Sequence, residues 1–135
     1  MRALFSLLVL IPLAAVAGMT CHAVDCHAAE VSAVDTKFFN EEFLPLVKES
    51  CQRCHGEKKQ SSGLRLDSRD AVIKGGQNGP AIVPGKPDES LLMKVLEHTG
   101  DIQMPPDEKL NDEKIAIFKK WIEKDAPWPS EKKKY

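Results

Sequence analysis

The sequence predicts an all-α fold, with one small helical domain over residues 35–130. Apolar side chains recur at intervals of three and four residues in several segments, which is the spacing of one helix face. The stretches between these segments are polar or rich in glycine and proline, as loops are. No strand-rich region or internal repeat is visible, and 135 residues suffice for one small domain. We therefore expect helices joined by ordered loops.

The first helix is predicted to begin near Asp35, a residue type that favours helix N-termini. Its apolar face consists of Phe39, Phe43, Leu46 and Val47. Pro45 lies inside this pattern and is expected either to kink the helix or to mark its true start. The helix should carry residues 51–55 at its C-terminal end and stop at Gly56.

Three later helices are predicted: over residues 68–74, from Asp88 to Gly100, and from Asp112 until Pro127 and Pro129 prevent continuation. Their predicted N-caps are Asp67, Asp88 and Asp112. The glycine- and proline-rich segment 75–87 and the segment 104–107 are expected to be ordered loops.

Residues 1–17 are typical of a secretory signal peptide, with a positively charged start and an apolar run over residues 4–17. The run is short for a membrane span and ends in Ala15-Val16-Ala17, a suitable cleavage site. Cleavage as late as Ala29 is the alternative. Residues 18–34 form an irregular leader without a clear period. We therefore expect a periplasmic or otherwise exported protein.

The charge of the chain limits its partners. The formal net charge is −1, which argues against nucleic acid as a partner. Residues 131–135 form a short basic tail whose simplest role is solvation. Association with a membrane is compatible with the sequence but not required by it, and the oligomeric state stays open.

Cys51, Cys54 and His55 form a C-x-x-C-H motif, the attachment site of c-type haem. Two thiols at this spacing can add to the two vinyl groups of one porphyrin and form thioethers. The adjacent imidazole can then bind the iron. The sequence therefore predicts one haem c, covalently attached through Cys51 and Cys54, with His55 as an iron ligand.

Two other chemistries compete for the same residues. A zinc site would need two further ligands at tetrahedral spacing, and none follows Cys54. A thioredoxin-like thiol pair would need a βαβ pattern, whereas the flanks here are helical and then loop-rich. Haem is the interpretation that uses all three residues.

The second iron ligand has three downstream candidates: Met93, His98 and Met104. Met93 lies on a helical pattern and is better explained as a core residue. His98 lies near a helix C-terminus, where it is expected to be exposed. Met104 precedes two prolines, which impose an extended backbone that can hold a thioether rigidly over a flat ring. We therefore predict Met104 as the sixth ligand.

The ring nitrogen of His55 that faces away from the iron needs a hydrogen-bond acceptor. The carbonyl group at Gly79-Pro80 is a candidate, since glycine lets the backbone approach closely. An ordinary turn explains the same residues equally well.

Several segments together resemble the planctomycete-type cytochrome c domain. They are Cys51-x-x-Cys54-His55-Gly56, Gly63-Leu64-Arg65-Leu66-Asp67, Gly79-Pro80-Ala81, Pro84-Gly85, Ser90-Leu91-Leu92, Met104-Pro105-Pro106, Trp121-Ile122 and Ala126-Pro127-Trp128-Pro129. The resemblance implies a small class I cytochrome c fold, with helices wrapped around one covalently bound haem and the terminal helices crossing near its edge. It also implies His55 and Met104 as axial ligands, with the Pro80 carbonyl behind His55.

Arg65 and Asp125 each leave one structural question open. Arg65 is placed to meet a haem propionate, although a surface salt bridge explains it equally well. Asp125 departs from the resemblance, because the family often has glycine there, and this leaves the geometry of the last helix end open.

Cys21, Cys26 and His27 form a stretched C-x-x-x-x-C-H motif that the resemblance does not cover. Removal with the signal peptide, a disulfide and lipidation of Cys21 are competing explanations. We do not expect a second haem there, because the surrounding residues lack a pattern that could form a core.

The function expected from these residues is that of an electron carrier and not an enzyme. The chain would carry single electrons between redox partner proteins through a His/Met-ligated haem c. One alternative is a haem peroxidase-like enzyme, which needs an open distal site and an acid–base residue such as His98. The other is a haem-bearing docking module of a larger complex.

Overall fold

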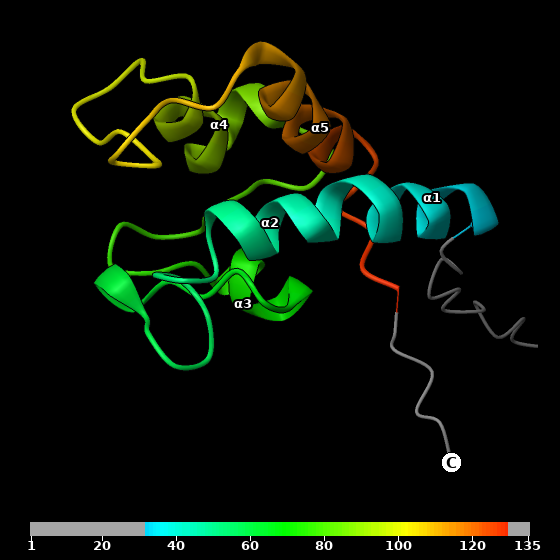
Figure 1. Ribbon diagram of the computed structural model, residues 1–135, viewed down its shortest axis with the longest axis horizontal. Helices are drawn as coiled ribbons and strands as arrows, with labels where there is room; N and C mark the ends of the chain where they lie inside the picture. The colour runs from blue at the N-terminus through cyan, green and yellow to red at the C-terminus, as the bar shows by residue number, and fades with distance from the viewer. Residues whose placement is uncertain (1–31, 130–135) are drawn as a thin grey trace, which may run out of the picture.

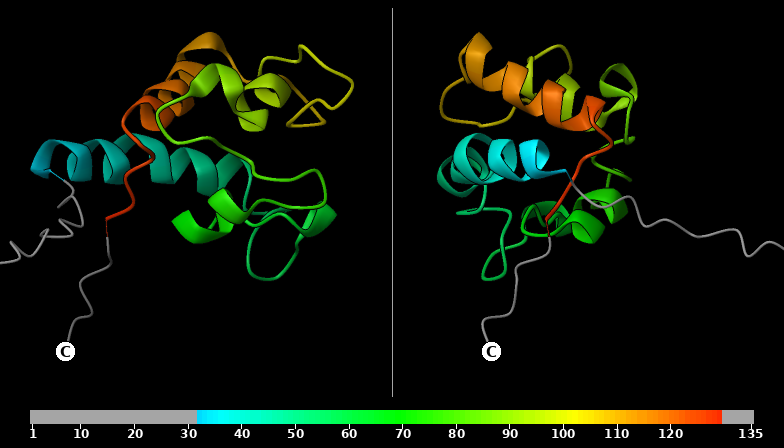
Figure 2. Two further views of the ribbon diagram at one scale, coloured as in Figure 1. Left: turned by 180° about the vertical axis from the view of Figure 1, so that it is seen from behind. Right: turned by 90° about the vertical axis from the view of Figure 1, so that its right-hand side faces the viewer.

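The computed structural model describes residues 32–129 and contains helices and turns but no strand in that range (Figures 1 and 2). The elements are α1 Ala33–Phe38, the π-helical turn η1 Phe39–Phe43, α2 Leu44–Ser50, the 3-10 turn η2 Ser61–Gly63, α3 Arg69–Lys74, the 3-10 turn η3 Pro87–Glu89, α4 Leu91–Leu96 and α5 Asp112–Glu123. The all-α prediction is confirmed for these residues. The predicted signal peptide, the Cys21-to-His27 motif, most of the predicted leader and the predicted basic tail lie outside them.

The first helix is continuous from α1 through η1 to α2 and crosses the middle of the molecule (Figure 1). Its N-cap is Ser32, whose hydroxyl accepts a hydrogen bond from the N–H of Asp35 at 3.1 Å. The helix therefore begins before the predicted cap, and Asp35 lies in its first turn, where a carboxylate favours the positive end of the helix dipole.

Pro45 is accommodated by the widened turn η1. The N–H of Leu44 bonds to the carbonyl of Phe39, five residues back, so the backbone is looser directly before the proline. Pro45 then occupies the first turn of α2, where its missing N–H costs little. Of the two expectations for Pro45, a kink or the start of the helix, the second is partly met. Pro45 lies at the start of the α-helical segment α2, but the first helix as a whole continues through this residue.

The core lies where α5 packs against the first helix. Phe43 stacks on Trp121 with 4.1 Å between ring centroids, and the ring of Phe118 meets Phe43 edge-on at 5.5 Å. The indole N–H of Trp121 donates to the carbonyl oxygen of Pro127 at 2.8 Å, so this buried polar group is satisfied. Each of these large side chains contributes on the order of 2–3 kcal/mol by leaving water.

The N-caps of the later helices differ from the predicted ones. Ser68, Ser90 and Asn111 take these positions in place of Asp67, Asp88 and Asp112. The Ser68 hydroxyl accepts from the N–H of Ala71 at 3.3 Å, and the Asn111 amide oxygen accepts from Lys114 at 3.0 Å. Serine, asparagine and aspartate are comparable N-caps by residue type. The path of the backbone in the folded protein decides which of them takes the position.

Helix α4 ends earlier than expected. It stops at Leu96 and not at Gly100, and His98, with φ 58°, takes a left-handed conformation just after it. The N–H of Thr99 bonds back to the carbonyl of Lys94 at 3.1 Å and closes this helix end.

The molecule has three tiers, with α4 and α5 above the first helix and α3 with its loops below (Figures 1 and 2). Arg69 of α3 ties the lower tier to the chain after α5, since its guanidinium donates to the carbonyl oxygens of Ala126 and Asp125 at 3.0 and 3.1 Å. Asp125 has φ 62°, a conformation that glycine adopts without strain. The glycine that the resemblance leads us to expect at this position would suit this conformation.

We expect Asp125→Gly to raise the free energy of unfolding by about 0.5–1 kcal/mol, because it removes a β-carbon from a left-handed backbone. The measurement is denaturant unfolding of the variant beside the unsubstituted protein. Asp125→Ala is the matched control: it also removes the carboxylate but keeps the β-carbon. Equal stability changes in the two variants would show that backbone strain is not the cause.

Candidate functional site

The C-x-x-C-H motif forms the turn that directly follows α2. The N–H of Cys51 bonds to the carbonyl of Val47, and the N–H of His55 bonds to the carbonyl of Cys51, both at 2.9 Å. The motif therefore follows the C-terminal end of the first helix, as predicted. Gly56 does not end the helix but allows a close approach, because a β-carbon there would lie 2.6 Å from the carbonyl oxygen of Gln52.

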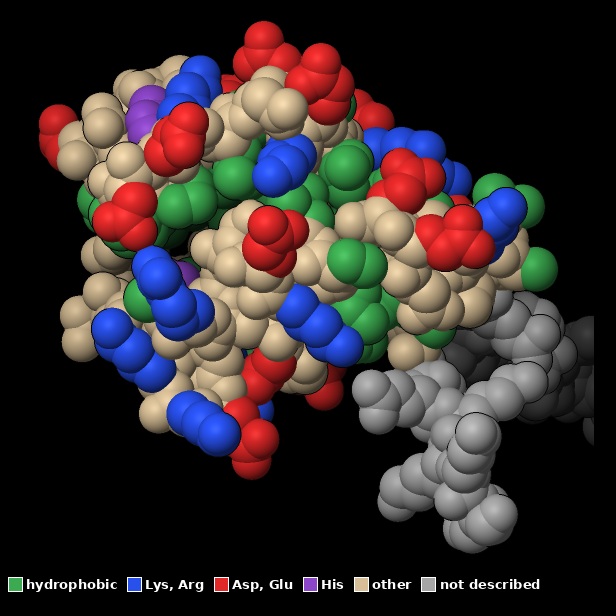
Figure 3. Space-filling view, in the orientation of Figure 1, with side chains coloured by type: hydrophobic (Ala, Val, Ile, Leu, Met, Phe, Trp, Pro, Cys, Tyr) green, Lys and Arg blue, Asp and Glu red, His purple; other side chains and the backbone are tan. Residues whose placement is uncertain are grey.

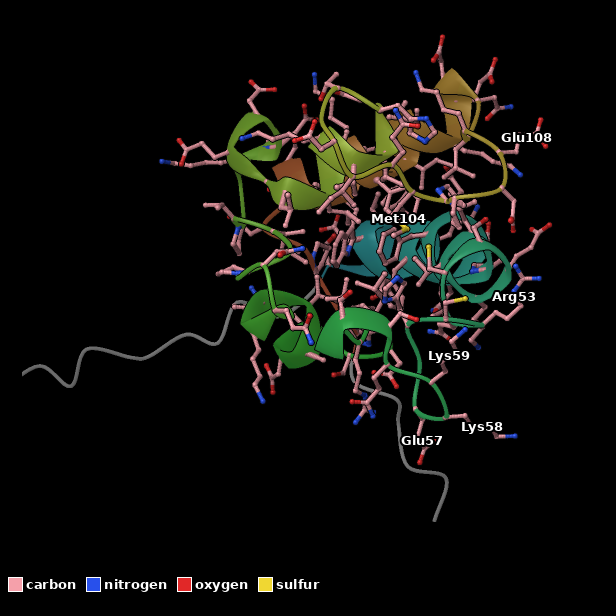
Figure 4. The ribbon with its side chains drawn as sticks, turned by 90° about the vertical axis from the view of Figure 1, so that its left-hand side faces the viewer. Arg53, Glu57, Lys58, Lys59, Met104 and Glu108 are labelled. Carbon is pink, nitrogen blue, oxygen red and sulfur yellow. The ribbon has the colours of Figure 1, made fainter. Side chains whose placement is uncertain are left out.

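Two neighbouring cavities, of about 260 and 290 Å³, lie beside this turn. Both are lined by His55, Leu64, Leu92, Val95 and Met104. Hydrophobic side chains surround a hollow between the upper and lower tiers at the left of Figure 3, and Figure 4 shows Met104 directed into this region. The shared residues make the two cavities one apolar site with an imidazole and a thioether in its wall.

Met104 is the described methionine that reaches the site. Its backbone N–H bonds to the carbonyl of Val95 in α4 at 2.9 Å, and its side chain lines both cavities. Met93 is 3% exposed, belongs to the hydrophobic core and lines neither cavity. The interpretation of Met93 as a core residue is confirmed, and the structure brings Met104 and His55 to the same cavity.

His55 is buried at the border of the two cavities. Its Nδ1 lies 3.4 Å from the carbonyl oxygen of Leu64, the hydrogen-bond partner that the described residues provide. When Nδ1–H donates to this carbonyl, the lone pair stands on Nε2, as a metal ligand requires. The role expected of the Pro80 carbonyl stays a prediction.

Both cysteine thiols are free and line the larger cavity. Cys51 is 8% exposed, and burial raises the pKa of its thiol to about 11. Cys54 is more accessible, and its sulfur accepts a hydrogen bond from the Lys59 ammonium at 3.8 Å. The two nucleophiles of the motif therefore differ in environment.

Arg65 lines neither of the two cavities. Its guanidinium forms an ion pair with Asp67 at 2.8 Å, and this hydrogen-bonded carboxylate raises the pKa of Arg65. The structure therefore contains the salt bridge that was one of the two interpretations of this residue.

Sequence reasoning missed the polar side chains of the smaller cavity, which are Ser62, Gln77 and Asn78. They lie on loops that were identified only as loops. Gly75 makes their placement possible: with φ 73° its β-carbon would lie 1.8 Å from the carbonyl oxygen of Gly79. The glycine-rich composition was the available signal, since it indicates a tight backbone approach.

Two other classes of site find no support in residues 32–129. There, no three His, Cys, Asp or Glu side chains come together in a way that could hold a metal ion. None of the helices described is long and apolar enough to cross a membrane.

We expect Cys51 in the folded, haem-free protein to alkylate slowly, because burial disfavours the reactive thiolate. With a pKa of about 11, the rate at Cys51 should still be rising at pH 10. Reaction with iodoacetamide between pH 7 and 11, followed by peptide mass spectrometry, measures this. The protein unfolded in guanidinium is the control, and equal Cys51 rates in both states would contradict the prediction.

The comparison with known families agrees with this geometry. Residues 51–108 match the family model described as Planctomycete cytochrome C, a segment that begins at the C-x-x-C-H motif and includes Met104. No curated protein and no solved structure matches the chain. A cytochrome c domain implies covalent haem c, and Cys51 and Cys54 are in place for it. Over residues 51–108 the chain is thus similar to the cytochrome c domain of the planctomycete family.

Proposed function

We propose that this protein is a monohaem c-type cytochrome that carries single electrons between redox partners. Haem c would be attached through Cys51 and Cys54, and His55 and Met104 would hold its iron. The observation that carries the proposal is that an imidazole and a thioether line the same apolar cavities beside two free thiols.

The residues fit this cofactor. The shared wall of the cavities is apolar apart from the two ligand groups, as a porphyrin face requires. With its Nδ1–H donating to the Leu64 carbonyl, His55 would keep Nε2 free to bind the metal. Haem supplies an iron that alternates between the ferrous and ferric states. A Met/His pair would raise its reduction potential relative to two histidines, and the two side chains would leave no open site for a substrate.

The polar side chains of the smaller cavity suit the carboxylate edge of such a cofactor. Ser62, Gln77 and Asn78 offer hydroxyl and amide donors on the side of His55 away from the cysteines, which line only the larger cavity. We propose these groups, rather than Arg65 alone, as hydrogen-bond donors to the haem propionates.

The peroxidase alternative is less well supported. It would need an acid–base residue at an open distal face, and His98 was the candidate. His98 lines neither cavity, and its Nε2 lies 3.3 Å from the backbone oxygen of Met104. An electron carrier, with both axial positions filled, uses the same residues without a distal acid or base.

Redox partner proteins would dock briefly where the cavities open, through a small contact. The rim there is of mixed charge, since Arg53, Lys59 and Asp107 line the larger cavity. In Figure 4, Lys58 and Glu108 project outward from the loops below and above it. We further propose that the protein works outside the cytoplasm, in keeping with its signal-peptide-like start.

The function is tested by electron exchange. The purified protein should keep its haem through acid–acetone extraction, because thioether bonds survive it, and Cys51→Ser or Cys54→Ser should weaken this retention. The reduced protein should be rapidly reoxidised by a soluble oxidant, with negligible turnover of peroxide plus an organic reductant. Extractable haem would contradict the attachment, and sustained peroxide turnover would favour the enzyme.

Met104→Ala tests the sixth ligand. The oxidised protein should show the weak sulfur-to-iron charge-transfer band at the red end of the spectrum, and the variant should lose it and bind added imidazole. Met93→Leu is the matched control, because it keeps the volume of a core side chain that lines neither cavity. Loss of the band in Met93→Leu alone would move the ligand to Met93.

A further inference from the structure

We propose that His98 is a positioning residue for Met104. Its imidazole holds the backbone of the loop 104–107, here called the ligand loop, without entering the cavity. This role rests on the proposed function, in which Met104 binds the iron. His98 is thereby assigned a task that neither the attachment motif nor the family match includes.

The backbone of Met104 is held on both sides. Its N–H donates to the carbonyl of Val95 at 2.9 Å, and its carbonyl oxygen lies 3.3 Å from Nε2 of His98. Since a carbonyl only accepts, the proton of the neutral imidazole stands on Nε2. The two bonds attach the peptide groups before and after Met104 to the end of α4, which restricts where the thioether can point.

The backbone conformation of His98 supports the same conclusion. Its φ of 58° is unfavourable for a residue with a β-carbon, and glycine or asparagine is usual at such a helix end. The side chain is half-buried, and its bond to Met104 crosses the irregular segment between α4 and the ligand loop. A histidine in this position accepts a strained left-handed backbone, and its side chain gains a hydrogen bond to the ligand loop.

The other tether of the loop is weaker. Arg53 of the attachment turn pairs with Asp107 at 3.1 Å, but their side chains are 80% and 77% exposed. Ion pairs so exposed are screened by solvent and contribute little. Of the polar contacts described for this loop, the bonds to Val95 and His98 are therefore the stronger ones.

His98→Gly in the haem-loaded protein separates the two roles of this residue. Glycine relieves the left-handed backbone, so thermal stability should be kept, but the bond to Met104 is lost. We expect a weaker sulfur-to-iron band and about fivefold tighter binding of imidazole, the effect of one hydrogen bond on loop opening. His98→Gln places an amide N–H at the same distance along the side chain and should restore both readouts toward those of the unsubstituted protein.

Asp107→Asn is the control on the same loop and should change imidazole affinity by less than about twofold. Unchanged band and affinity in His98→Gly, or no rescue by His98→Gln, overturns the role of His98 while the ligation stands. A band that persists in Met104→Ala overturns the ligation by Met104, and the role of His98 with it.

Discussion

The packing of Phe43 against Trp121 is the contact on which the rest of the structure depends. Phe43 lies on the helix that ends at the C-x-x-C-H turn, and Trp121 lies on α5, which packs against α4. The aromatic stack therefore sets the distance between the tier that carries His55 and the tier that carries Met104. Because interiors are closely packed, a change in this stack would be transmitted to the cavities between the tiers.

The site itself is made by loops that the helices hold in place. His55 is oriented by the Leu64 carbonyl, and Met104 is held through backbone bonds to Val95 and His98. Gly75 lets two backbone segments approach more closely than any other residue would allow. Hydrogen bonds between backbone and ligand groups leave little freedom for the ligands, which suits a site where the same two groups would bind the iron in both oxidation states.

Several features followed from the sequence because they are local. The helical spacing of apolar residues, the prolines and glycines of the loops and the C-x-x-C-H spacing indicated an all-α chain with a haem-attachment turn. The double proline after Met104 singled out that methionine, and the helical pattern around Met93 marked it as a core residue. Each inference needed only residues within a few positions of one another.

Other features depended on contacts between distant residues, which no local pattern contains. The sequence could not show that Ser68 and Asn111 rather than their aspartate neighbours cap helices, because these residue types are comparable caps. Nor could it show that the Leu64 carbonyl lies within hydrogen-bond distance of His55, or that Asn78 lines a cavity. The sequence by itself determined which groups can bind a haem. The tertiary structure decided which backbone carbonyls orient them, because those hydrogen bonds form only once the tiers have packed.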